Sequence, residues 1–245
     1  MNPTITLAVA RRVLLQLRRD HRTVALLLGV PCVLLTLLWW MFDRQPVAFD
    51  HLGPPLLAMF PFIVMFLVTS VTTLRERSSG TLERLLSMPM AKLDLLVGYA
   101  IAFGVVALAQ ALLAVGLTVG LLGLDVSGPV WALALVAVVD AVLGTTLGLF
   151  VSAFAETEFQ AVQFMPAVVI PQILLCGLFV PRSALPDALH AVSDVLPLSY
   201  AVDAMQRLQV SAGLSSAFWV DLTVIGAFVA TSVALGAATL RRRTA

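Results

Sequence analysis

The sequence contains little charge. Only 12% of its 245 residues are charged, whereas 60% are hydrophobic, and the mean hydropathy is +1.00. A soluble domain carries about twice that share of charge. A water-soluble fold of this size cannot bury so much apolar surface, which excludes a soluble domain and indicates an integral membrane protein. The net charge of +1 gives no reason to expect a nucleic-acid partner.

Side chains that carry chemistry are also scarce. Cys32 and Cys176 lie far apart in apolar runs and the three histidines are isolated, so we expect no metal and no cofactor bound by this chain. Lys92, the only lysine, lacks the Gly-Lys-Ser/Thr context of a phosphate-binding loop. We therefore expect no ATP site and no enzyme. The excess of arginine over lysine is typical of a GC-rich bacterial genome.

Six apolar stretches are each long enough to cross a bilayer. A helix rises about 1.5 Å per residue, so roughly 20 apolar residues cross the hydrocarbon core. The predicted spans are residues 23–42, 56–74, 95–117, 130–153, 159–180 and 219–240. With a cytoplasmic N-terminus, the outer segments hold only Arg44, Arg182 and Arg207 of the fifteen basic residues. We therefore predict a bacterial inner-membrane protein with both termini in the cytoplasm.

Two stretches outside the spans have predicted structure of their own. In residues 4–22, apolar residues repeat at helical spacing while Arg11, Arg18 and Arg22 share another face, which predicts a helix lying in the cytoplasmic interface. A basic patch that only sets topology, or a brace for a partner, fits the same pattern. Residues 181–218 hold three prolines and a broken apolar pattern, which predicts one or two short re-entrant helices.

Polar and small residues within the spans predict helix contacts. Asp140 is the only acid deep in a predicted span, and Gln110 lies at a similar depth, so we predict a hydrogen bond between them. Asp140 could bind a cation or proton on the translocation path, but we favour a structural role in this hydrogen bond. The pairs Gly116/Gly120 and Gly144/Gly148 have the spacing that permits close helix packing.

The predicted cytoplasmic loop between the second and third spans contains a short helix. Gly80 is an acceptable N-cap with Glu83 three residues later, and Pro89 stops the helix. Its leucines fall on one face: Leu82, Leu85 and Leu86. Two turns are too short to be stable alone in water. This helix must therefore lie against the bilayer surface or a cytoplasmic protein.

This loop resembles the signature loop of the ABC-2 type permeases, the membrane subunits of ABC exporters related to the daunorubicin-resistance permease. The matching positions are Arg75, Glu76, Gly80, Thr81, Leu82, Glu83, Leu85, Leu86, Pro89 and Asp94. Tyr99 departs from the lysine that the family often has there. A second match is the segment before the last span, with Pro197, Tyr200, Asp203 and Arg207.

The resemblance implies an all-α half-transporter that forms one transmembrane domain over residues 1–245. Its parts are the interfacial helix (1–22), spans 1–2 (23–74), the coupling loop (75–92), spans 3–5 (93–180), the outer re-entrant segment (181–218), and span 6 with its tail (219–245). Two ATPase subunits, carrying ATP and Mg²⁺, dock on this loop and on that of a second permease copy or paralogue, and Arg75, Glu76 and Glu83 clamp it to the ATPase or to neighbouring span ends.

The function so implied is export of hydrophobic small molecules, as in drug efflux or antibiotic resistance. The alternative is an ion-gradient-driven secondary transporter or channel that uses Asp140. Such a carrier has no need of the pattern at residues 80–89.

Overall fold

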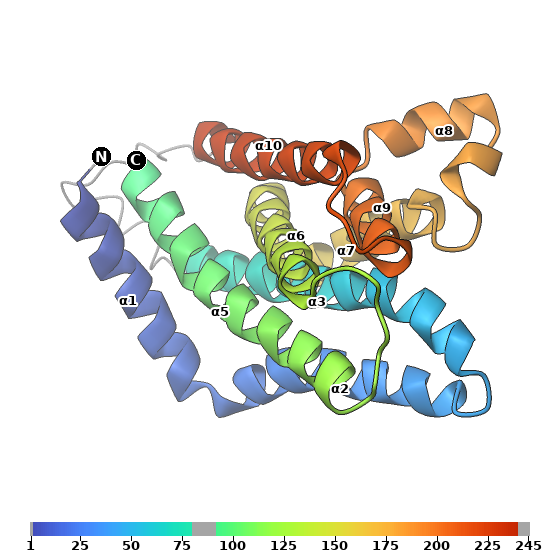
Figure 1. Ribbon diagram of the computed structural model, residues 1–245. Coiled ribbons are helices and arrows are strands. Elements are labelled where there is room, and N and C mark those ends of the chain that lie inside the picture. The colour runs from blue at the N-terminus through green and yellow to red at the C-terminus, as the bar shows by residue number, and fades with distance from the viewer. Residues whose placement is uncertain (1, 80–91, 240–245) are drawn as a thin grey trace.

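The computed structural model describes residues 2–79 and 92–239, and this part of the chain is helical without strands (Figure 1). The elements are α1 (Pro3–Arg19), α2 (His21–Met41), α3 (Pro46–Ser78), α5 (Lys92–Gly120), α6 (Val130–Ser152), α7 (Glu158–Leu175), η1 (Arg182–Ala184), α8 (Asp187–Asp194), α9 (Pro197–Val210) and α10 (Ser216–Thr239). The end of the bundle at which α1 lies, predicted to be cytoplasmic, is called the inner end below.

Six of these helices are long and apolar enough to cross a membrane: α2, α3, α5, α6, α7 and α10. They confirm the six predicted spans, with two differences in length. Helix α3 begins at Pro46, ten residues before the predicted span, because proline suits the first turn of a helix. Helix α7 ends at Leu175, five residues early, because Gly177 has a φ of 92° that continues no helix.

The centre of the bundle is a close contact between α3 and α6. Helix α6 is the most buried of the six spans. A Cβ atom on Gly144 would lie 2.3 Å from the carbonyl oxygen of Phe62, and one on Gly148 would lie 2.4 Å from that of Phe66. Glycine alone allows this approach, which confirms the packing predicted for this pair. A Cβ atom on Gly116 or Gly120 would meet no heavy atom within 4 Å in the described part of the chain, so this pair makes no comparable contact.

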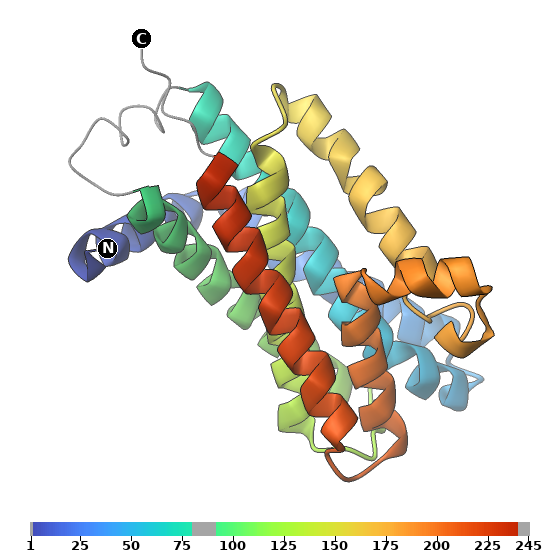
Figure 2. The same ribbon diagram turned by 90° about the horizontal axis from the view of Figure 1, so that it is seen from above.

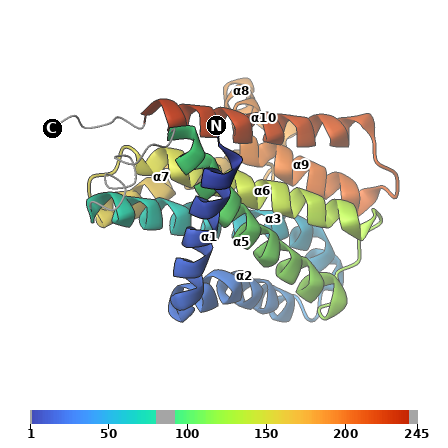
Figure 3. The same ribbon diagram turned by 90° about the vertical axis from the view of Figure 1, so that its left-hand side faces the viewer.

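Helix α1 crosses the inner end, transverse to α2 and α10 (Figures 1 and 3). It begins at Pro3 because the Asn2 side chain caps it, and it ends before Asp20, whose carboxylate caps α2 by accepting from Thr23. Its apolar face packs along α5. A Cβ on Gly98 would lie 2.7 Å from the Cβ of Val9, so glycine is needed for this contact. The amphipathic helix predicted within residues 4–22 is thus formed.

The connection between α7 and α10 contains more helix than predicted. A 3-10 turn, η1, precedes α8 and α9, and Figure 2 shows α9 running beside α10. At its start, the backbone N–H of Leu198 donates to Gln172 of α7 at 3.3 Å. At its end, the carbonyl of Leu208 accepts from the Gly128 N–H at 2.7 Å. Helix α9 therefore connects α7 with the outer loop between α5 and α6.

Candidate functional site at the inner end

The two helix ends that flank the signature loop, the last turn of α3 and the first turn of α5, lie at the inner end. Arg75 and Glu76 belong to the last turn of α3, and Asp94 belongs to the first turn of α5. The other predicted coupling residues lie outside the described residues: Gly80, Thr81, Leu82, Glu83, Leu85, Leu86 and Pro89. The coupling helix is therefore still a prediction. The structure describes how the two helix ends that flank it, called the loop stems below, are held.

Glu76 fixes the first loop stem to α1. Its Oε1 accepts from Nη2 of Arg12 at 2.7 Å, and the Glu76 side chain is only 11% exposed. The same Nη2 lies 3.3 Å from the hydroxyl of Tyr99 on α5, the position that departs from the family pattern. A charge-assisted hydrogen bond shielded from water is stronger than an exposed one. Arg12 thereby connects three helices at one point.

Asp94 fixes the second loop stem to the same helix. Its Oδ1 accepts from the backbone N–H of Asn2 at 2.8 Å and from the hydroxyl of Thr6 at 3.2 Å. Asp94 is 2% exposed. Hydrogen bonds from two donors fix the position of this buried carboxylate. Helix α1 therefore holds both loop stems.

Arg75 connects the first loop stem to α7. Its Nε and Nη2 donate to the two carboxylate oxygens of Glu158 at 3.0 and 3.1 Å. Both side chains are largely exposed, 63% and 49%, so water and salt weaken this pair. Arg75 and Glu76 thus contact Glu158 of α7 and Arg12 of α1. That these two residues and Glu83 clamp the coupling loop to an ATPase or to neighbouring span ends is still a prediction. Arg12 was not predicted from the sequence. Only its position outside the face shared by Arg11, Arg18 and Arg22 distinguishes it from the other arginines of α1.

The predicted hydrogen bond between Asp140 and Gln110 is not formed. Nε2 of Gln110 donates instead to the backbone carbonyl of Leu27 in α2 at 2.7 Å. The Oε1 of Gln110 and both carboxylate oxygens of Asp140 are buried without a partner in the described part of the chain. Asp140 and Gln110 lie at a similar depth in their spans, but their side chains do not face each other. Among the described residues, no group of three His, Cys, Asp or Glu could hold a metal ion.

At the opposite end of the bundle, called the outer end, residues of the second predicted motif form a network around Arg182. Arg182 was not identified from the sequence as part of this motif. The guanidinium of Arg182 pairs with Asp203 of α9 and with Asp194 of α8, and it lies 5.2 Å from the ring centroid of Tyr200. Burial raises the pKa of Asp203, and Arg182 opposes that shift.

Two further residues of this motif, Arg207 and Pro197, have structural roles at the outer end. Arg207 pairs with Asp221 of α10 at 2.9 Å, which ties α9 to the last span. Pro197 occupies the first turn of α9, where a missing N–H costs nothing. No local pattern marks Arg182, because its partners lie 12 and 21 residues later.

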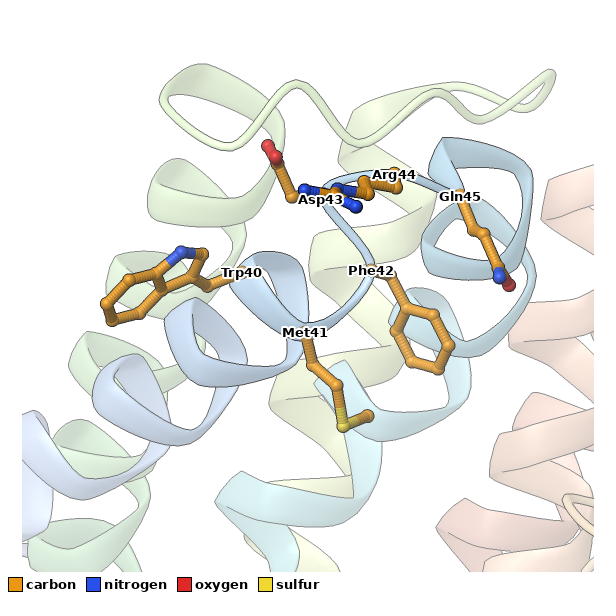
Figure 4. A pocket seen from close by; sticks show the side chains of 6 residues that line it. All are labelled: Trp40, Met41, Phe42, Asp43, Arg44 and Gln45. Atoms are coloured by element: carbon orange, nitrogen blue, oxygen red, sulfur yellow. The ribbon is translucent and has the colours of Figure 1, made fainter.

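A small surface pocket at the turn between α2 and α3 is formed by consecutive residues. Figure 4 shows the side chains of residues 40–45 around it, with Trp40 and Met41 on the last turn of α2 and Asp43 and Arg44 on the turn itself. Exposed tryptophan next to charged residues is typical of a membrane–water boundary. The composition of this turn fits the predicted outer end of the first span.

The fold and these sites define an all-helical, multi-pass membrane protein whose loop stems at one end are bound to an amphipathic N-terminal helix. Residues 4–210 match the ABC-2 type transporter family. The chain belongs to this family.

Several curated relatives are similar to this chain at low identity. The chain is 27% identical over 193 residues to the probable multidrug ABC transporter permease YbhR of Escherichia coli strain K12, covering 78% of this chain and 52% of YbhR. It is 25% identical over 171 residues to the probable multidrug permease YbhS of the same strain, covering 69% and 45%. The inner membrane transport permease YhhJ of that strain is 25% identical over 147 residues, covering 60% and 39%. The chain thus spans about half the length of the curated relatives it matches.

Proposed function

We propose that this chain is the transmembrane permease subunit of an ATP-driven ABC exporter for hydrophobic small molecules, such as a drug, an antibiotic or a lipid-like compound. Two separate ATPase subunits bind ATP and Mg²⁺, and a second permease, a copy or a paralogue, completes the transporter. Membership of the ABC-2 family and similarity to two probable multidrug permeases support this proposal. The observation that carries it is the fixation of both loop stems to α1.

The inner-end contacts give a route for motion from the loop into the bundle. Glu76 connects its stem to Arg12, Asp94 connects the other stem to Asn2 and Thr6, and Arg75 connects to α7. At Gly144 and Gly148, helix α6 also approaches the backbone of α3 directly. A displacement of residues 80–91 by a docked ATPase is therefore passed to α1, α3, α5 and α7 together, because none can move without breaking a charged contact.

We also propose that the inner end faces the cytoplasm of a bacterial inner membrane, and that α8 and α9 form the re-entrant segment. Contacts of α9 with Gln172 at one end and Gly128 at the other support this placement, since its 14 residues extend about 20 Å from within the bundle to the outer loop.

Co-purification with the ATPase encoded beside this gene tests the proposal, together with the ATP hydrolysis rate of the complex. Glu83→Arg and Leu86→Asp should release the ATPase, or uncouple hydrolysis from transport, while membrane insertion stays normal. Asp125→Arg, a charge reversal on an exposed residue of the outer loop, is the matched control and should leave both unchanged. Normal association in both loop variants would defeat the docking assignment.

A further inference from the structure

Helix α1 has a second face, opposite the one that packs on α5. Along it, leucine and arginine alternate at helical spacing: Leu7, Arg11, Leu15 and Arg18, with Arg19 beside them. Leu7 is 60% exposed and Leu15 is 43% exposed. We call these five residues the arginine face. The face combines apolar and cationic side chains that no other part of the described chain covers.

The three arginines of this face differ from Arg12 in having no partner within the described part of the chain. No ion pair joins Arg11, Arg18 or Arg19 to a described acidic residue. Helix α1 contains no acidic residue. The nearest in sequence, Asp20, accepts from the Thr23 N–H and hydroxyl at 3.1 and 2.6 Å, and these bonds hold its pKa below the usual range. Asp20 is therefore charged, but it caps α2 and forms no ion pair with a described arginine of this face. One carboxylate cannot balance three guanidinium groups, so the face keeps a net positive charge.

We propose that the arginine face binds the headgroups of anionic phospholipids in the inner leaflet. Only Asp20 separates α1 from α2, a membrane span, so the face begins at the membrane surface. Helix α1 lies transverse to the spans (Figure 3), so its length runs along that surface. Guanidinium groups bind phosphate in a fork geometry, and the leucines between them reach the acyl chains.

Lipid binding to α1 should also affect coupling to the ATPase, an inference that rests on the proposed function. Thr6, on the opposite side of the helix, holds Asp94. Arg12, at the edge of the arginine face, holds Glu76, so the same helix carries both loop stems. Anionic lipid that fixes α1 at the membrane surface therefore also fixes the stems, and coupled ATP hydrolysis is faster in membranes that contain it.

Lipid selectivity of the full-length permease alone tests the proposal. The protein is reconstituted in phosphatidylcholine membranes with spin-labelled phosphatidylglycerol or spin-labelled phosphatidylcholine, and the motionally restricted fraction of each label is measured. The wild type should prefer phosphatidylglycerol, by about fivefold for each arginine in contact, and lose this preference at high salt. The triple variant Arg11→Gln/Arg18→Gln/Arg19→Gln should retain little of it, while Arg44→Gln, at the exposed outer turn, should retain it.

The outcomes separate the possible occupants of the face. If the triple variant inserts correctly and still prefers phosphatidylglycerol as the wild type does, the proposal is wrong. If the triple variant does not fold, the wild type alone decides: a preference for phosphatidylglycerol that does not fall at high salt also contradicts the proposal. If selectivity is unchanged but the variant releases the ATPase, the face contacts an acidic protein surface instead. Since lipid selectivity is measured without the ATPase, failure of the Glu83→Arg test would not affect it.

Discussion

The side-chain amide of Gln110 donates a hydrogen bond to the backbone carbonyl of Leu27, with 2.7 Å between Nε2 and the oxygen. Pro31, four residues later in α2, has no N–H group, so the Leu27 carbonyl loses its helical donor. Gln110 on α5 supplies the missing donor. In a bilayer no water can do so, and an unsatisfied carbonyl is costly there. The proline and the glutamine thus form one structural unit across two helices.

A double-mutant cycle tests this relationship. Gln110→Leu should destabilise the permease by about 1–2 kcal/mol, because the Leu27 carbonyl is left without a donor. In a Pro31→Ala background the backbone N–H is restored, and the same substitution should cost less than about 0.5 kcal/mol. The measurement is the unfolding free energy of the four proteins in detergent. Equal costs in the two backgrounds would show that Gln110 and Pro31 are not energetically coupled, which would contradict this relationship.

This unit also shows where sequence reasoning stopped. Counting along the spans correctly identified Gln110 as a polar residue within the membrane, but depth does not say which way a side chain points. Pro31 was the available signal, because a proline inside a span predicts a free carbonyl one turn earlier. The six spans and the amphipathic helix could be predicted because hydropathy and period are local properties. Arg12 and Arg182 could not, because their partners are set by how distant helices pack.

The contact between α3 and α6 predicts a difference between two glycine pairs. Gly144→Ala should destabilise the bundle by about 1–3 kcal/mol, because its Cβ would overlap the carbonyl of Phe62. Gly116→Ala should be neutral or slightly stabilising, because it meets no neighbour and alanine favours a helix. Thermal unfolding of the detergent-solubilised variants provides the comparison. Equal midpoints would mean that α3 and α6 are not in close contact.

The two ion pairs of the first loop stem should differ in importance. Arg12→Gln leaves Glu76 shielded and unpaired, and should cost about 1–3 kcal/mol of stability and lower transport-coupled ATP hydrolysis. Arg75→Gln breaks an exposed pair and should cost at most about 1 kcal/mol. The exchange Arg12→Glu/Glu76→Arg should recover part of the coupling. A larger effect of Arg75→Gln on both measurements would reverse this ranking.

The outer network predicts that Arg182 cannot be replaced by lysine. Its guanidinium binds Asp194 and Asp203 at once and lies over the Tyr200 ring, which a single ammonium group cannot reproduce. Arg182→Lys should therefore recover less than half of the stability lost in Arg182→Gln. Limited proteolysis of the segment between α7 and α9 reports on this directly. If Arg182→Lys protects this segment from proteolysis as fully as the wild type does, charge neutralisation alone is enough and the guanidinium geometry is not needed.

Asp140 gives the test that separates the exporter from a gradient-driven carrier. Its two carboxylate oxygens contact no polar group in the described part of the chain, so Asp140→Asn removes no described interaction. Transport by the reconstituted complex should stay within about twofold of the wild type, and Asp140→Leu should raise the unfolding midpoint, since it removes a buried polar group without a partner.

Asp203→Asn is the matched control for Asp140, because the same substitution is made at a partly buried aspartate that does have a partner. It weakens the pair with Arg182 and should lower stability by about 1–3 kcal/mol, an effect that Asp140→Asn lacks. The opposite pattern, with transport abolished in a correctly inserted and stable Asp140→Asn protein, would mean that this carboxyl group binds the transported ion or proton. Because a carrier driven by an ion gradient must bind its coupling ion within the membrane, that result would favour the carrier.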